Sequence, residues 1–302
     1  MLARTRKGLA AARATMTAPV VLVPTMGALH DGHRSLLALA RELAGPAGSV
    51  LVSIFVNPLQ FGAGEDFERY PRTIEQDLEL CAEGGVSVVF APAGREMYPR
   101  DPRVTVDAGP VGRLLEGEFR PGFFGGVLTV VMKLLQLTRP DIAVFGEKDA
   151  QQLALIRQLA ADLDLGIQIA GAPIHRDADG LATSSRNVYL STWERAVALA
   201  IPRALAAAAR AAPAGPAAAL AAAALLLEAA SAAEPPLELD YLVLADPLTF
   251  TEVGPDYAGP ALLLAAARVG GTRLIDNIGL TFGARPGAPP PAPPLERHAA
   301  DD

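Results

Sequence analysis

Short runs of apolar, mostly β-branched residues alternate with stretches of helical periodicity through the first half of the chain. Five such runs are predicted strands, at residues 20–23, 50–56, 86–90, 142–145 and 167–170. Helices are predicted between or after them, at residues 33–44, 73–83, 127–137 and 149–162. Two parallel strands need a crossover connection, and a helix is the usual one. The alternation therefore predicts an α/β fold with a Rossmann-like, mostly parallel sheet.

The pattern changes after about residue 175. Two Ala-rich helices are predicted over residues 192–233, and three strands follow at residues 239–244, 261–269 and 272–278. Helices and strands that are segregated along the chain favour a separate α+β unit. We therefore predict a smaller C-terminal α+β domain beside the Rossmann-like domain.

The length and composition of the chain fit two domains. At 302 residues it is about twice the usual size of one domain, and its 51% of hydrophobic residues can build a sizeable core. The predicted boundaries are residues 1–175 for the Rossmann-like domain and 176–283 for the C-terminal domain. Residues 284–302 are rich in Pro and Ala and cannot build a core, so they are predicted to be a disordered tail.

Charge and cysteine content exclude several classes of protein. The net charge is −7 and the sequence has no basic cluster, which argues against a nucleic-acid partner. Cys81 is the single cysteine, so a disulfide within the chain is impossible and a reducing compartment, the cytoplasm, is expected. Charges and prolines interrupt the Ala-rich stretch 204–233, and the start of the sequence has no apolar signal core. Neither a membrane span nor export is therefore expected.

Two of the four histidines, His30 and His33, lie at the turn between the first predicted strand and its helix. The turn consists of Met26, Gly27, Ala28, Leu29, His30, Asp31, Gly32 and His33. Its glycines let the backbone approach a ligand, and the helix that follows, with Asp31 as a possible N-cap, offers free N–H groups to phosphate. No third ligand of the zinc type lies nearby in sequence, so a nucleotide site is favoured over a metal site. Core or N-cap histidines remain the alternative.

Three more polar clusters have the chemistry of a small-molecule site. Two directly follow predicted strands: Asn57 with Gln60, and then Gly146, Glu147, Lys148 and Asp149. The third consists of Thr183, Ser184, Ser185 and Arg186, two serines and an arginine that could hold an anion. Taken singly, each cluster could be a polar loop, a helix cap or a surface turn. The histidine turn and the two clusters after strands fall on one edge of a parallel sheet, which is where such folds bind ligands.

In order and spacing, these segments resemble the pantothenate synthetase family. The stretch Pro-Thr-Met-Gly-Ala-Leu-His-Asp-Gly-His at 24–33 is similar to the His-x-Gly-His signature of the nucleotidylyltransferase superfamily. The segments at 53–61, 70–73, 145–149 and 179–187 narrow the match to pantothenate synthetases. The resemblance extends from about residue 20 to 280. It implies a ligase that condenses pantoate with β-alanine through a pantoyl-adenylate, consuming ATP with Mg²⁺ and releasing AMP and pyrophosphate.

The resemblance also implies roles for individual residues. The turn 26–33 would wrap ATP, with His33, expected to open the helix, as the main donor to the leaving pyrophosphate and His30 as a supporting one. Residues 146–149 would hold the nucleotide, with Lys148 on its phosphates. Thr183, Ser184, Ser185 and Arg186 would close over the phosphates, and His175 would touch the adenine side through its backbone. Asn57, Gln60 and Gln152 would bind pantoate.

The family pattern further implies a homodimer, a C-terminal domain that acts as a lid, and a pair of acidic residues near a metal. That pair is Gln76 and Asp77 here, which leaves Asp77 as the candidate Mg²⁺ ligand. Other departures are Phe123 for a histidine expected in a loop or dimer region, Ala150 for an aromatic residue, Thr183 and Leu59 for methionines, and His175 for an apolar residue. The alternative functions are a nucleotidylyltransferase that stops at the nucleotidyl product and a non-catalytic nucleotide-binding module. A class I tRNA synthetase is disfavoured because the chain is short and acidic.

Overall fold

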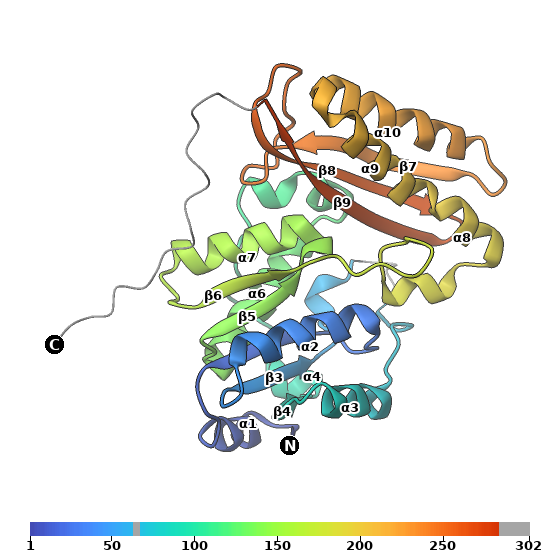
Figure 1. The fold of residues 1–302 in the computed structure, drawn as a ribbon. Coiled ribbons are helices and arrows are strands. Elements are labelled where there is room, and N and C mark those ends of the chain that lie inside the picture. Colours follow the sequence, from blue (N-terminus) through green and yellow to red (C-terminus); the bar gives the residue numbers. More distant parts are fainter. Residues whose placement is uncertain (63–66, 284–302) are drawn as a thin grey trace.

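A six-stranded parallel sheet forms the centre of the first half of the chain (Figure 1). The computed structural model describes residues 1–62 and 67–283, so the predicted tail at 284–302 lies outside the described residues. The strands are β1 (Leu2–Ala3), β2 (Val20–Thr25), β3 (Ser49–Ile54), β4 (Val88–Phe90), β5 (Ile142–Gly146) and β6 (Gln168–Ala172). They lie in the order β1-β4-β3-β2-β5-β6 and every pair is parallel. The five predicted strands are confirmed, and β1 is a short addition at the edge.

Helices cover both faces of this sheet, because alternate side chains of each buried strand point to opposite faces. On one face, Leu22 and Leu51 pack with α1 (Arg6–Arg13), α6 (Phe123–Thr138) and α7 (Ala150–Asp162). On the other face, Val21 and Val50 pack with α2 (Asp31–Ala44) and α3 (Ile74–Glu83). Two short helices, α4 (Gly94–Met97) and α5 (Glu116–Phe119), lie in the long connection before α6. This is the doubly wound α/β arrangement that the sequence predicts.

The C-terminal part consists of a helical layer on a three-stranded antiparallel sheet. The helices are α8 (Thr192–Ala198), α9 (Ala200–Ala211) and α10 (Pro216–Ser231), and the strands are β7 (Leu237–Ala245), β8 (Gly259–Val269) and β9 (Thr272–Phe282). The predicted helices over residues 192–233 are present as two helical runs, and the first run, Thr192–Ala214, is interrupted at Leu199. Pro202 has no N–H to continue the hydrogen-bond ladder of α8, and it is tolerated in the first turn of α9.

The helical run Thr192–Ala214 is long and apolar enough to cross a membrane by length and composition alone. Its buried side chains include Ile201, Ala204 and Leu205, and they belong to the same core as Leu263 and Leu280 of the antiparallel sheet. Packing within the fold therefore accounts for its apolar face.

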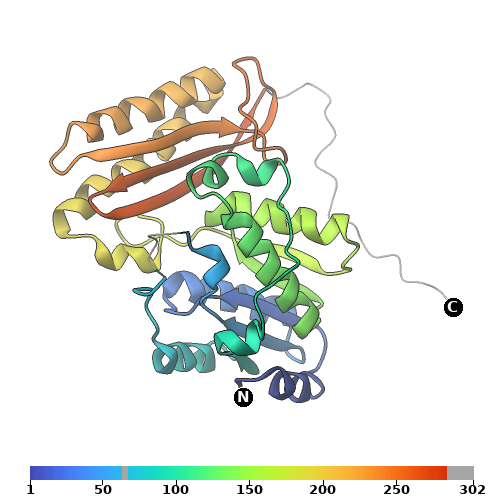
Figure 2. The same ribbon diagram turned by 180° about the vertical axis from the view of Figure 1, so that it is seen from behind.

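The antiparallel sheet lies across the first half of the chain, with its edge strand β9 facing the parallel sheet (Figures 1 and 2). β9 contacts the turn that follows β5 and the 3-10 helix Ser185–Tyr189. Both segments carry predicted site residues. The fold thus brings the C-terminal sheet against the carboxyl edge of the parallel sheet, while the domain boundary at residue 175 stays a prediction.

Candidate active site

The turn between β2 and α2 has a strained backbone that a distant carboxylate supports. Gly27 has φ +88° and Ala28 has φ 51°, a left-handed conformation that is unfavourable for alanine. Asp77 of α3 is 1% exposed, and its Oδ2 and Oδ1 accept hydrogen bonds from the backbone N–H groups of Ala28 (3.1 Å) and Leu29 (2.8 Å). Asp77 therefore fixes the shape of the histidine turn.

This position gives Asp77 a structural role, while its assignment to a metal stays a prediction. Both of its oxygens are already engaged, Oδ1 also accepting a bond from Thr73 Oγ1 at 3.1 Å. Among residues 1–62 and 67–283, no group of three or more His, Cys, Asp or Glu side chains could hold a metal ion. The sequence pattern could not distinguish a metal ligand from a carboxylate that receives backbone N–H groups.

Replacing Asp77 by Asn is expected to raise the KM for ATP about tenfold and to lower the melting temperature. The amide would turn a donor toward one of two buried N–H groups, and a lost buried partner costs about 1–3 kcal/mol. Steady-state kinetics and thermal unfolding check this, and exposed Glu75 of the same helix provides the control variant Glu75→Gln. A changed Mg²⁺ concentration for half-maximal rate at unchanged melting temperature would instead support the predicted metal role.

His30 and His33 form a reciprocal cap at the start of α2. His30 is the N-cap residue, which corrects the expected N-cap Asp31 and the expectation that His33 opens the helix. His30 Nδ1 accepts a bond from Gly32 N, and His33 Nδ1 accepts one from His30 N, both at 3.2 Å. A nitrogen that accepts a backbone N–H carries no proton itself, so in each neutral ring the proton must be on Nε2. The cap therefore fixes the position of an Nε2–H donor on each of the two imidazole rings.

Both imidazoles are neutral at pH 7. Burial lowers the pKa of His30 to about 4, and the nearby Lys148 contributes in the same direction. Burial, followed by the charge of His30, lowers the pKa of His33 to about 3. Protonation of either Nδ1 would also place its N–H directly opposite the backbone N–H group that it now accepts. The pair therefore offers hydrogen-bond donors to an anion while carrying no charge of its own.

After β3, the buried Asn57 side chain contacts the side chain of Gln60, and Gln60 lies on the cavity side of Asn57. Asn57 is fully buried, and its Oδ1 accepts bonds from Leu59 N (3.3 Å) and Tyr98 Oη (3.0 Å). Its Nδ2 donates to Gly126 O (3.1 Å) and to Gln60 Oε1 (3.0 Å). All hydrogen-bonding capacity of the Asn57 side chain is used within the protein in this structure, and its assignment to substrate stays a prediction. Because Asn57 binds the Oε1 atom of Gln60, the Nε2 group of Gln60 points away from Asn57.

Arg120 is a residue of this region that the sequence analysis missed. Its Nη2 donates to Gln60 O at 3.1 Å, and its guanidinium lies 3.7 Å from the centre of the Phe123 ring, a cation–π contact. Phe123 is the first residue of α6 and lines the cavities described below, which corrects its expected place in a loop, while a place in a dimer region stays a prediction. The aromatic residue that departs from the family pattern thus supports an arginine at the site.

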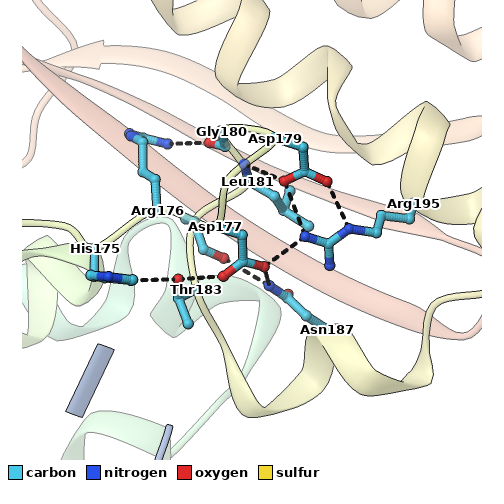
Figure 3. A network of polar contacts seen from close by, with 10 residues as sticks. His175, Arg176, Asp177, Asp179, Gly180, Leu181, Thr183, Asn187 and Arg195 are labelled. Carbon is cyan, nitrogen blue, oxygen red and sulfur yellow. Dashed lines mark hydrogen bonds and ion pairs between the residues drawn. The ribbon is translucent and has the colours of Figure 1, made fainter. Parts of the chain in front are cut away.

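The segment 175–187 is held by a polar network (Figure 3). Thr183 Oγ1 donates to Asp177 Oδ1 (2.6 Å), so it can only accept from the His175 Nδ1, 2.9 Å away. Arg195 donates to Asp177 and Asp179 at 2.7 Å each. Burial raises the pKa of Asp177, but hydrogen bonds from Thr183, Arg195 and Asn187 outweigh this and lower it overall. Two of the positions that depart from the family pattern, 175 and 183, therefore contact each other.

Two adjoining cavities, of about 270 and 660 Å³, lie where these segments meet. The smaller one is lined by most of the predicted site residues: Met26, His30, Gly32, His33, Gln60, Gly146, Lys148, Asp149, Gln152, His175, Thr183, Ser184, Ser185 and Arg186. Lys148, Gln152, Ser184 and Arg186 also line the larger one. Within the described chain, Gly27, Ala28, Leu29, Asp31, Asn57, Asp77 and Glu147 line neither cavity. Ser184 also caps its own 3-10 helix by accepting from Arg186 N at 3.3 Å.

These features define a class of protein. Paired imidazole donors, a lysine and serines at the carboxyl edge of a Rossmann-like sheet are typical of an α/β enzyme that acts on phosphate-bearing ligands. The family model of pantoate–beta-alanine ligase matches residues 2–279. The chain belongs to the pantoate–beta-alanine ligase family, whose members are ligases that form a C–N bond.

Several relatives match over most of their length. A pantothenate synthetase of Thermobifida fusca is 61% identical over 269 residues, which is 87% of this chain and 90% of that protein. One of Streptomyces coelicolor is 55% identical, with the same coverage of both chains. A crystal structure of pantothenate synthetase from Thermus thermophilus matches with a TM-score of 0.84 at 42% identity, covering 92% of this chain and 98% of that one. A pantoate–beta-alanine ligase from Francisella tularensis, complexed with beta-gamma ATP and beta-alanine, matches with a TM-score of 0.74 at 32% identity, covering 92% and 97%.

Proposed function

We propose that the chain condenses pantoate with β-alanine at the expense of ATP, through a pantoyl-adenylate. The observation that carries this is the pair of neutral imidazoles whose Nε2 protons are fixed at the start of α2, in a cavity that also contains Lys148. Imidazole donors fixed at a helix start and a lysine suit the phosphates of ATP. The F. tularensis relative supports the same choice of ligands, because it was crystallised with an ATP compound and β-alanine.

In the first step, a carboxylate oxygen of pantoate attacks the α-phosphorus and the bond to pyrophosphate breaks. Negative charge accumulates on the leaving pyrophosphate, and catalysis of such a step consists mainly of positioning and charge stabilisation. We assign this stabilisation to the Nε2 donors of His33 and His30, to Lys148, and to the anion cradle of Ser184, Ser185 and Arg186. In the second step, the amine of β-alanine attacks the acyl carbon, and AMP leaves.

Pantoate is assigned to Gln60 and Gln152. The Oε1 of Gln60 accepts from Asn57, so its Nε2 donors are available to a carboxylate or hydroxyl group. Gln152 lines both cavities from the start of α7. Neutral amides suit a hydroxy acid better than a phosphorylated substrate. This favours the ligase over a nucleotidylyltransferase that stops at the nucleotidyl product.

Three further properties belong to the same proposal. The described residues do not form a metal cage, so Mg²⁺ would be held mainly by the ATP phosphates. The C-terminal domain would act as a lid that keeps water from the mixed anhydride. The protein would work in the cytoplasm, in line with its single cysteine, and as a homodimer, in line with the family resemblance.

Product analysis with pantoate and β-alanine, added separately and together, tests the proposal. With pantoate alone we expect about one equivalent of pyrophosphate per site, because the adenylate stays bound. With both substrates we expect continuous formation of AMP, pyrophosphate and pantothenate. ATP turnover without pantoate would contradict the proposal. Steady release of a free nucleotidyl product, with β-alanine making no difference, would favour the transferase.

A further inference from the structure

Two adjacent polar residues of the edge strand β9, Asp276 and Asn277, are buried, with 4% and 6% of their surface exposed. Consecutive residues of a strand point to opposite faces, so both faces of β9 are covered at this place. Elsewhere the strand alternates, with Leu274, Leu280 and Phe282 in the core under the helices. Buried polar side chains need hydrogen-bond partners. Asp276 and Asn277 each find theirs in a different segment of the site.

Asn277 holds the turn that carries Lys148. Its Nδ2 donates to Glu147 O at 3.0 Å and to Lys148 O at 2.9 Å. Because both partners are carbonyl oxygens, the amide can have one orientation only. Within the described chain, neither Gly146 before the 3-10 turn Glu147–Asp149 nor Asp149 before α7 makes a side-chain cap. Asn277, some 130 residues away in sequence, holds the turn instead through its carbonyl oxygens.

Asp276 holds the opposite wall of the site. Its Oδ2 and Oδ1 accept from Arg176 at 2.7 and 3.0 Å. Arg176 also donates to Gly180 O at 3.2 Å (Figure 3). Arg176 pairs with Ala182 across the hairpin that leads to Thr183 and the serines. The two residues of the pair are joined as well, because Asn277 N donates to Asp276 Oδ1 at 2.8 Å.

We propose that Asp276 and Asn277 are positioning residues that fix the Lys148 turn and the 175–186 segment relative to each other. The inference rests on the proposed function, since it concerns the two walls that would hold the phosphates of ATP. Asn277 acts through Lys148: without its two bonds, the turn is free to shift and the ammonium group loses its place. A displacement of about 1 Å in a positioning group can cost up to 10²-fold in rate.

Asn277→Ala is expected to weaken ATP binding and to lower kcat/KM for ATP about tenfold, with a smaller change for pantoate. The decisive measurement is a double-mutant cycle with Lys148→Ala, using the Kd of ATP from calorimetry and kcat/KM. If Asn277 acts through Lys148, Asn277→Ala has little further effect once Lys148 is gone. Equal losses in both backgrounds, or an unchanged Kd and kcat/KM in the single variant, would overturn the proposal.

Two other variants distinguish a specific loss of ATP binding from a general loss of stability. Asn277→Ser keeps one donor and is expected to give an intermediate loss, even where Asn277→Ala folds poorly. Thr138→Val is the matched control, because Thr138 is fully buried, donates to Leu134 O, and lies just before β5 at the other edge of the sheet. It should lower the melting temperature and leave the Kd of ATP unchanged. Since Kd needs no turnover, a wild type that binds ATP but makes no pantothenate would count against the proposed function and not against the positioning role.

Discussion

His33→Ala lowers kcat by about 10²–10³-fold, the usual loss when one preorganised donor to a developing negative charge is removed. The neutral ring donates through Nε2, because its Nδ1 accepts the N–H of His30 and its pKa lies at about 3. The cap holds the His33 ring in place before the reaction. The ring therefore need not move when charge develops on the pyrophosphate. Pre-steady-state release of pyrophosphate measures the affected step directly, separate from the attack by β-alanine.

The matched variant His33→Asn separates catalysis from helix capping. The Oδ1 of Asn can occupy the place of Nδ1 and accept the His30 N–H, while nothing remains at the place of Nε2. Its melting temperature should therefore be close to that of the wild type, whereas His33→Ala also loses a cap bond that contributes about 1 kcal/mol. Its kcat should fall as far as that of His33→Ala. A near-normal kcat in His33→Asn would remove the imidazole from the mechanism.

The sequence could predict the sheet and the edge where the site lies, because both depend on local patterns. β-Branched runs such as 20–23 and 142–145 are buried on both faces of the sheet and leave a clear signal. The polar residues that follow β2, β3 and β5 must then meet at one edge, whatever the details of packing. For the same reason the sequence places Gln60 and Lys148 at this edge, and the family resemblance adds Gln152; all three line the smaller cavity.

What the sequence could not predict is which polar side chains are used up inside the protein. Asp77, Asn57 and Asn277 are all buried, and their partners are backbone groups of segments that lie far away along the chain, 48, 69 and 130 residues distant. No spacing rule links a side chain to a backbone carbonyl at such separations. The sequence therefore contains no sign that Asp77 and Asn57 hold turns, and it singled out nothing at Asn277.

Gln152→Ala is expected to raise the KM for pantoate on the order of tenfold or more, with a much smaller change in the KM for ATP. A site that hydrogen-bonds a hydroxy acid loses about 1.5–3 kcal/mol when a bond to its charged group is removed. Gln152 lines both cavities, so its amide can reach a ligand without any rearrangement of α7. Steady-state kinetics with each substrate varied in turn measures the two KM values, and equal increases would refute the assignment.

The neighbouring Gln151 provides the control: it also lines the larger cavity, but its side chain is buried and bonded to backbone groups. Gln151 is 3% exposed; its Nε2 donates to Val111 O (2.8 Å) and Leu114 O (2.9 Å), and its Oε1 accepts from Glu116 N (3.2 Å). Gln151→Ala leaves these backbone groups without partners, so it should lower the melting temperature by several degrees. Gln152→Ala should leave the melting temperature nearly unchanged. Opposite responses from adjacent residues of the same type would show that recognition of pantoate depends on which side of α7 the amide faces.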